Sequence, residues 1–141
     1  MKMQSKTTAP VEKFFNEVIN MHKPEVLDQL LSSDFVSHDY PKPHSNNSRE
    51  EMKEGMNAML RAFPDLAIRI EDMRESGDEV VTRGTWTGTQ KADFQGIPTT
   101  NKKVNVHFID IWKVEDGKLK ENWVQMDTME MMQQLGKMPV S

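Results

Sequence analysis

The apolar residues in the first half of the chain recur every three or four positions, which is the spacing of one face of a helix. The first run consists of Val11, Phe14, Val18 and Met21. A second, shorter run covers residues 24–31. Ser48 and Glu51 stand in the spacing of a capping box, which predicts a third helix that ends before Pro64. We therefore expect three helices, with a short extended stretch over residues 35–40 between the second and the third.

From residue 66 onward, apolar and polar residues alternate, as they do in strands with one buried face. We expect a first strand that runs from residue 66 to a turn at residues 76–78, and three more over residues 79–90, 103–114 and 118–126. The Asp-Gly pair at residues 116–117 marks a hairpin. A short helix over residues 127–135 follows, between Asp127 as N-cap and Gly136 as C-cap. Helices followed by an antiparallel meander predict an α+β domain whose helices cover one face of a curved sheet.

The length of 141 residues suits one domain, and no repeat or long linker divides it. We expect a single domain over residues 1–141, in which residues 1–9 form a flexible N-terminal segment. The absence of cysteine excludes a disulfide framework, a thiolate metal site and a cysteine nucleophile. The start lacks the apolar core of a signal peptide and no apolar run could span a bilayer, so we expect a cytoplasmic protein without a membrane partner. A net charge of −4, with scattered lysines, argues against nucleic acid as a partner.

Asp110 is an unusual residue for its place, because it interrupts the apolar strand Phe108–Trp112. If it faces a pocket, burial would raise the pKa of its carboxyl group and suit it to acid/base chemistry. The alternative is a structural role, in which the carboxylate binds a backbone amide, Arg83 or a helix end. Strand alternation turns His107 to the opposite face of the sheet, unless a bulge reverses the register.

Two further residues are candidates for catalysis. His38 lies in the extended stretch between the second and third helices, where it could bind a substrate carbonyl or act as a base, or simply fill space. Asp127 follows the fourth strand and is either a third catalytic candidate or only the cap of the last helix. No spacing of His, Asp and Glu indicates a metal site, because a proline-rich loop separates His38 from His44.

Aromatic residues and the twelve methionines offer an apolar wall for a flat or cyclic ligand, although core packing or a dimer interface would also use them. The candidate substrate-binding residues are Phe63, Trp86, Phe108, Trp112, Asn122, Trp123 and Val124.

A series of short motifs occurs in a characteristic order between residues 63 and 136. They are Phe63-Pro64-Asp65-Leu66, Glu71-Asp72, Gly77-Asp78-Glu79-Val80-Val81, Gly88-Thr89, Gly96-Ile97-Pro98, Asp116-Gly117-Lys118, Trp123 and Gln134-Leu135-Gly136. In this order and spacing they resemble the SnoaL-like polyketide cyclases, also called predicted ester cyclases, of the nuclear transport factor 2-like superfamily. The resemblance covers about residues 11–136. It implies a cone-shaped α+β barrel, usually a homodimer, with a pocket between the sheet and the helices.

The resemblance also implies a mechanism. The cyclases of this family close a ring by aldol condensation without a metal or cofactor, using an aspartate that is assisted by a histidine. Counting from the flanking motifs places the family's aspartate at Val124 and its histidine at Asp110, so this sequence departs from the cyclase pattern at both positions.

Three hypotheses about function remain open from the sequence. The first is a cofactor-free cyclase, isomerase or lyase that acts on a small carbonyl-bearing, polyketide-like molecule, with Asp110 as acid/base and His38 as a hydrogen-bond donor or second base. The second is a homodimer that binds a small organic molecule without turnover, which the loss of the aspartate at Val124 favours. The third is a purely structural dimerisation module.

Overall fold

The computed structural model describes residues 5–137, and its helices match the predicted positions closely. Their bounds are Ala9–Lys13 (α1), Phe14–Asn20 (η1), Pro24–Val26 (η2), Leu27–Leu30 (α2), Arg49–Ala62 (α3) and Thr128–Gln134 (α4). The first predicted helix is α-helical only over its first turn, because η1 continues it as a π-helix. The second predicted helix begins with η2, which is a 3₁₀ turn. Nowhere in residues 5–137 is a helix long and apolar enough to cross a membrane.

Within the described residues, the strands form one six-stranded sheet in the order β2-β1-β6-β5-β4-β3. Their bounds are Leu31–His38 (β1), Asn46–Ser48 (β2), Ala67–Ser76 (β3), Glu79–Thr89 (β4), Lys103–Glu115 (β5) and Lys118–Met126 (β6). The predicted meander of β3 to β6 is confirmed, with antiparallel pairing throughout. The structure adds one parallel pairing to this antiparallel meander, because β1 pairs with β6 in parallel. β1 also begins at Leu31, four residues before the predicted start, because Leu31 pairs with Leu119.

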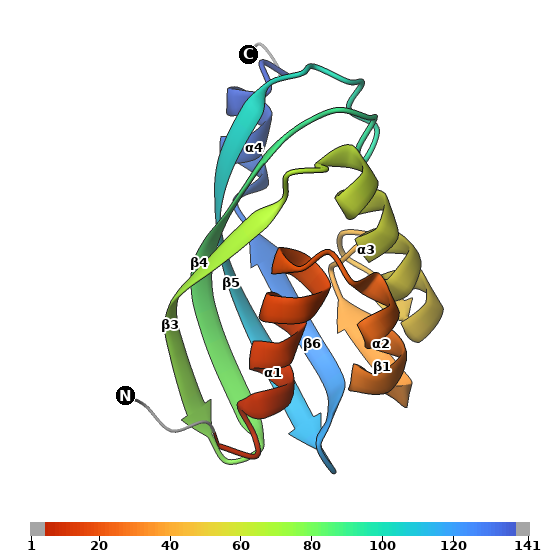
Figure 1. The fold of residues 1–141 in the computed structure, drawn as a ribbon, viewed down its shortest axis with the longest axis vertical. Helices are drawn as coiled ribbons and strands as arrows, with labels where there is room; N and C mark the ends of the chain where they lie inside the picture. The colour runs from red at the N-terminus through yellow and green to blue at the C-terminus, as the bar shows by residue number, and fades with distance from the viewer. Residues whose placement is uncertain (1–4, 138–141) are drawn as a thin grey trace.

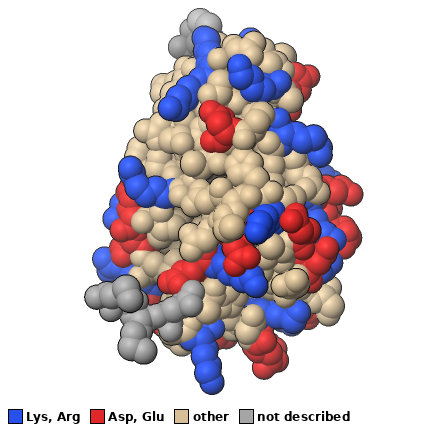
Figure 2. Space-filling view, viewed as in Figure 1, with Lys and Arg blue, Asp and Glu red and all other residues tan. Residues whose placement is uncertain are grey.

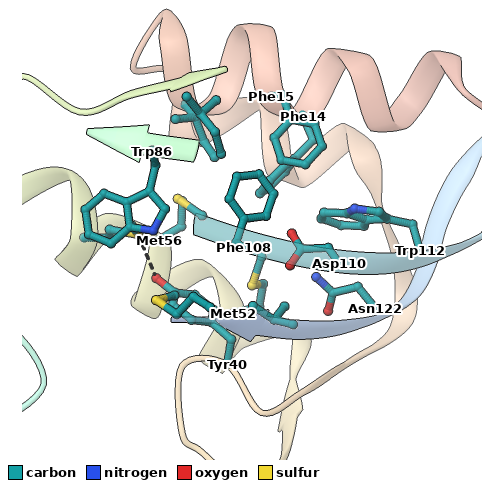
Figure 3. A pocket seen from close by; sticks show the side chains of 15 residues that line it. Phe14, Phe15, Tyr40, Met52, Met56, Trp86, Phe108, Asp110, Trp112 and Asn122 are labelled. Carbon is teal, nitrogen blue, oxygen red and sulfur yellow. Dashed lines mark hydrogen bonds between the residues drawn. The ribbon is translucent and has the colours of Figure 1, made fainter. Parts of the chain in front are cut away.

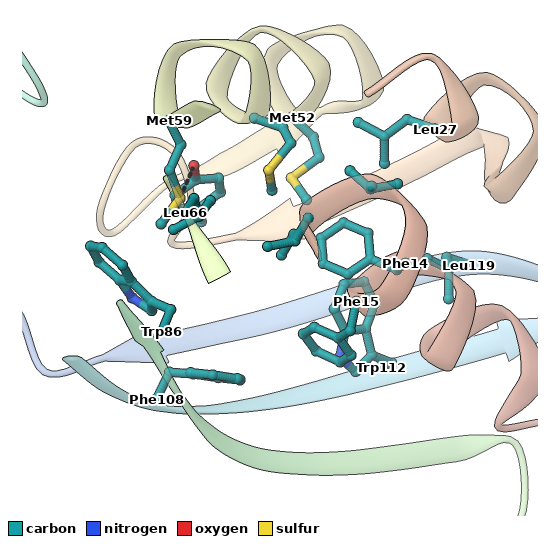
Figure 4. Close-up of a cluster of buried hydrophobic side chains, with 14 of the residues drawn as sticks. Phe14, Phe15, Leu27, Met52, Met59, Leu66, Trp86, Phe108, Trp112 and Leu119 are labelled. Carbon is teal, nitrogen blue, oxygen red and sulfur yellow. Dashed lines mark hydrogen bonds between the residues drawn. The ribbon is translucent and has the colours of Figure 1, made fainter. Parts of the chain in front are cut away.

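The helices before β3 cover one face of the curved sheet, as expected, and α4 does not join them (Figure 1). Apolar side chains of η1 and α3 meet the inner face of the sheet and form a continuous core (Figure 4). α4 packs on the outer face, where Gln134 bonds to the backbone of Asn105 and Glu130 contacts His107. The last helix therefore covers part of the outer face of the sheet, the face opposite the other helices.

Alternation along β5 determines which side chains meet the helices. Even-numbered residues from 104 to 114 are buried, and the odd-numbered residues between them are exposed or only partly covered. Asp110 therefore faces the same side as Phe108 and Trp112, whereas His107 lies on the opposite face, as the alternation predicts. The strand has no bulge in its pairing with β4, so the register is continuous along that edge.

Local signals place the ends of α3 and α4 where the sequence predicts them. The Ser48 side chain accepts a hydrogen bond from the Glu51 amide at 3.1 Å, and the Ser48 amide donates to the Glu51 carboxylate at 3.0 Å. This reciprocal pair confirms the capping box and holds α3 at its N-terminus. Asp127 accepts from the Glu130 amide at 2.9 Å, which confirms its capping role.

The predicted flexible segment over residues 1–9 lies partly outside the described residues, since the description begins at Ser5. Ser5 and Thr8 form a hydrogen-bonded turn, and Ser5 Oγ donates to the Glu75 carboxylate at 2.8 Å. α1 then begins at Ala9. Figure 2 shows basic and acidic side chains interspersed on the helix-bearing face, around a largely uncharged centre.

Candidate active site

A cavity lies between the inner face of the sheet and the helices that cover it (Figure 3). The cavity, counted together with the open space in front of it, measures about 430 Å³. Its wall consists mainly of aromatic and methionine side chains, with two polar residues among them. The lining residues are Phe14, Phe15, Ile19, Tyr40, Met52, Met56, Met59, Ile68, Trp86, Phe108, Asp110, Trp112, Asn122, Val124 and Met126. Such an apolar space with a few polar groups is the usual form of a small-molecule site.

The roof of the cavity comes from η1 and α3. The wide turn of the π-helix carries Phe14, Phe15 and Ile19 into the lining, and π-helical turns are frequent at functional sites. Phe14 packs against Trp112 with ring centroids 4.8 Å apart, and Phe15 lies 6.0 Å from Phe108. α3 adds three methionines at helical spacing, whose flexible thioethers adapt to irregular shapes.

Asp110 lies on β5 and is only 6 % exposed. Its Oδ1 atom has no hydrogen-bond partner among the described residues. Burial raises the pKa of the carboxyl group well above its ordinary value, and a hydrogen bond with the Gln125 backbone opposes this only in part. Asp110 therefore keeps its proton to a much higher pH than an exposed aspartate and can act as an acid inside the cavity.

Asn122 lies beside Asp110 on the neighbouring strand β6 (Figure 3). Asp110 pairs directly with Val124, and Asn122 is the next inward residue of that strand. Asn122 is 1 % exposed, and neither its amide oxygen nor its amide nitrogen has a partner in the described structure. A buried polar group without a partner costs about 1–3 kcal/mol, so these atoms are suited to bind a polar ligand or water.

Tyr40 closes one side of the cavity and was not a candidate in the sequence. Its hydroxyl lies 3.1 Å from the Gly55 carbonyl oxygen and 3.3 Å from the Met59 sulfur. Burial, and secondarily the nearby Asp110 carboxylate, raise the pKa of the Tyr40 hydroxyl, which therefore stays neutral. The signal available in the sequence was an aromatic residue at the end of a short extended stretch, directly before Pro41.

Five of the seven predicted substrate-binding residues line the cavity. They are Trp86, Phe108, Trp112, Asn122 and Val124. Phe63 is buried behind the wall, where its ring meets Trp86 edge-on with centroids 5.1 Å apart. Trp123 points away from the cavity and stacks on His38 at 5.0 Å, because odd-numbered residues of this part of β6 face outward.

Of the three predicted catalytic residues, the structure brings only Asp110 to the cavity. His38 lies on the outer face, where Nε2 is 2.5 Å from the Glu121 carboxylate and Nδ1 is 2.8 Å from the Asn46 amide oxygen. Its neighbour Ser37 takes the inward position on β1, which turns His38 away from the cavity, where it was expected to bind a substrate carbonyl or act as a base. Asp127 caps α4 and is absent from the lining.

The register of β5 and β6 relates this site to the family positions noted above. Asp110 and Val124 are a direct cross-strand pair, so the positions of the family's histidine and aspartate are immediate neighbours. Asp110, which supplies the one carboxyl group of the lining among the described residues, therefore lies one strand away from the position at which the resemblance places the catalytic aspartate. Throughout residues 5–137, no three His, Asp or Glu side chains gather in a way that could hold a metal ion.

A second, more polar hollow adjoins the cavity and shares Tyr40, Val124 and Met126 with it. Gln125 and Asp39 meet across this hollow, with Gln125 Nε2 donating to the Asp39 carboxylate at 3.1 Å. The shared residues place this hollow beside one end of the cavity.

Comparisons with known proteins agree with this architecture. A family model described as SnoaL-like polyketide cyclase matches residues 9–135. TsrD from Streptomyces laurentii is 27% identical with a TM-score of 0.84, over 98% of this chain and 100% of that one. IdmH from Streptomyces antibioticus, a proposed polyketide cyclase, is 26% identical with a TM-score of 0.79, over 94% and 99%.

A proposed polyketide cyclase from Acidithiobacillus ferrooxidans is 25% identical with a TM-score of 0.81, over 97% of this chain and 99% of that one. A search of curated protein sequences finds no significant match. The structural likenesses confirm the α+β, nuclear transport factor 2-like fold that the sequence predicts.

Proposed function

Since this chain belongs to the SnoaL-like polyketide cyclase family, we propose that it performs cofactor-free acid/base chemistry on a small carbonyl-bearing, polyketide-like molecule. The observation that carries the proposal is the Asp110 carboxyl group, which is buried in an apolar cavity with Oδ1 unpaired in the described structure. A protonated carboxyl group in such a place can give its proton to a substrate oxygen without competition from water.

In the proposed reaction, Asp110 donates its proton to a carbonyl oxygen of the substrate while an enol carbon of the same molecule attacks the carbonyl carbon. A carbon–carbon bond forms, and the carbonyl oxygen becomes a hydroxyl. The Asp110 carboxylate then takes the proton that the enol oxygen loses, so the carboxyl group ends the cycle in its starting state. To form the enol, the same carboxyl group gives its proton to a carbonyl oxygen while its other oxygen takes a proton from the adjacent α-carbon, a step that an isomerase or lyase would also require.

Asn122 would assist this chemistry by binding the oxygen on which charge develops. Its side-chain nitrogen is a donor without a partner in the described residues, and it lies beside Asp110 (Figure 3). A fixed donor of this kind stabilises an enolate or alkoxide more effectively in a dry cavity than in water.

The proposal is tested by hydrogen–deuterium exchange at the α-carbon of 2-tetralone in D₂O, followed by NMR. We expect the protein to accelerate exchange and the Asp110→Asn variant to lose the acceleration by about 10²–10⁴-fold, the usual contribution of a general acid/base. Asp127→Asn is the matched control, because it removes a carboxyl group outside the cavity and keeps a residue that can cap α4. Exchange at the same rate with the wild type and Asp110→Asn would contradict the proposal.

A second candidate function is binding of the same class of molecule without turnover. It is favoured by Val124 at the family's aspartate position, and by the absence of any histidine from the cavity lining within residues 5–137. Saturable binding of 2-tetralone without accelerated exchange would distinguish this function from catalysis.

We also propose that the protein is a homodimer formed through the outer face of the sheet. Val81 and Ile111 form a cross-strand pair on this face, and Ile109 beside them is 50 % exposed. Contiguous exposed apolar side chains on a sheet are typical of an interface. Sedimentation should show a dimer at micromolar concentration and a monomer for Ile109→Glu; a wild-type monomer would count against this assembly.

A further inference from the structure

Trp86 presents a second unpaired donor to the cavity, across from Asp110 and Asn122 (Figure 3). The Trp86 side chain is 2 % exposed, and its Nε1 atom has no hydrogen-bond partner among residues 5–137. The other tryptophan of the lining differs in this respect, because Trp112 Nε1 donates to the Thr82 hydroxyl at 3.3 Å. Buried indole N–H groups usually find a partner, so the exception at Trp86 needs an explanation.

The ring of Trp86 is held in place by its neighbours. Phe63 meets it edge-on at 5.1 Å, and Phe94 supports Phe63 at 5.2 Å in the same manner. Trp86 is also the β4 residue that pairs with Ile68 on one side and Val106 on the other. A ring packed in this way presents its N–H in a fixed direction, which is what selective recognition of a ligand atom requires.

The unpaired groups of the lining define the chemistry of the occupant. Protonated Asp110, the amide nitrogen of Asn122 and the indole of Trp86 are three donors, and the amide oxygen of Asn122 is an acceptor. Within the described chain, the lining contains no lysine, arginine or histidine. An anion would lose its hydration here and find no opposite charge, and a cation would find only the protonated Asp110, so the cavity disfavours a charged ligand strongly.

We infer that the cavity selects an uncharged ligand with oxygen acceptors at two opposite ends. One oxygen binds Asp110 and Asn122, and the other binds the Nε1–H of Trp86, which is thereby a specificity-determining residue. The inference rests on the proposed function for the choice of site, but it concerns binding and does not depend on turnover.

The test compares two neutral bicyclic probes by isothermal titration calorimetry. The enantiomers of 4-hydroxy-1-tetralone carry oxygens on opposite sides of one ring, whereas 1-tetralone carries only the carbonyl. We expect the wild type to prefer one enantiomer of the hydroxyketone over 1-tetralone, and Trp86→Phe to reduce that preference about fivefold to tenfold, the effect of one lost hydrogen bond. The anion 1-naphthoate should bind at least tenfold more weakly than 1-tetralone.

Trp123→Phe is the matched control, because this tryptophan lies outside the cavity and the substitution should leave the preference unchanged. If Trp86→Phe folds poorly, measurements on the wild type alone still test the inference. Equal affinities of the wild type for the hydroxyketone and the ketone, or no binding of either, would overturn it. An unchanged preference in folded Trp86→Phe would overturn it as well. The two proposals can fail separately. A wild type that prefers the hydroxyketone but does not accelerate deuterium exchange would contradict the proposed catalysis and leave the Trp86 assignment intact.

Discussion

The Asp110 carboxyl group makes the stability of this protein depend on pH in an unusual direction. Its folded-state pKa is raised by burial, so between the ordinary pKa of about 3.9 and the raised value the folded state binds more protons than the unfolded state. The contribution of this carboxyl group to the unfolding free energy is therefore fully present at low pH and decreases as the pH rises. The slope is about 1.4 kcal/mol per pH unit, up to the folded-state pKa.

Asp110→Asn removes this titration and keeps the shape of the side chain. The difference in unfolding free energy between the variant and the wild type should therefore grow in favour of the variant by about 1.4 kcal/mol per pH unit from about pH 4 up to the folded-state pKa of Asp110. Urea unfolding of both proteins at pH 4.5, 5.5, 6.5 and 7.5 measures this difference. Other titrating groups are common to both proteins and cancel in the comparison.

Asp127→Asn again serves as the control for a change of carboxyl to amide, since Asp127 lies on the surface at the cap of α4, outside the cavity. A constant difference between Asp110→Asn and the wild type from pH 4.5 to 7.5 would refute the reasoning. It would mean that the folded protein ionises Asp110 as easily as the unfolded chain does, and the cavity would then offer no dry carboxylic acid for catalysis.

Three further variants test the packing around the site. Asn122→Leu replaces a side chain whose polar atoms lack partners in the described structure. The variant should therefore have an unfolding free energy higher by roughly 1–3 kcal/mol in urea titrations. It should also fail to bind ketones in calorimetry, because the donor to the ligand oxygen is lost. Gly84→Ala places a Cβ 2.3 Å from the Arg69 carbonyl oxygen and 3.0 Å from the Phe108 ring, so chemical unfolding should show a loss of about 1–3 kcal/mol. Ser48→Ala removes the capping box of α3 and should lower the unfolding free energy by about 1 kcal/mol; an unchanged value would show that the cap contributes nothing.

The residues that β5 contributes to the site could be predicted from the spacing of apolar and polar residues alone. Alternation in β5 places Phe108, Asp110 and Trp112 on one face and His107 on the other, and the observed register agrees because no bulge interrupts the pairing with β4. Such patterns are readable because a strand with a two-residue period and one buried face leaves its side chains only two directions.

Contacts between distant segments were decided only in the tertiary structure. His38 and Glu121 are separated by 83 positions, and their contact depends on the parallel pairing of β1 with β6, which no local pattern predicts. The entry of Tyr40 and Phe15 into the cavity likewise depends on how the loop and the π-helix pack over the sheet. The sequence by itself determined most of the elements and the inward face of β5, because these follow from short-range spacing. On β6 it left the neighbours Trp123 and Val124 both as candidates, and only the packed sheet turned Trp123 outward. Which residues meet across the cavity was decided by packing, because that depends on all the elements at once.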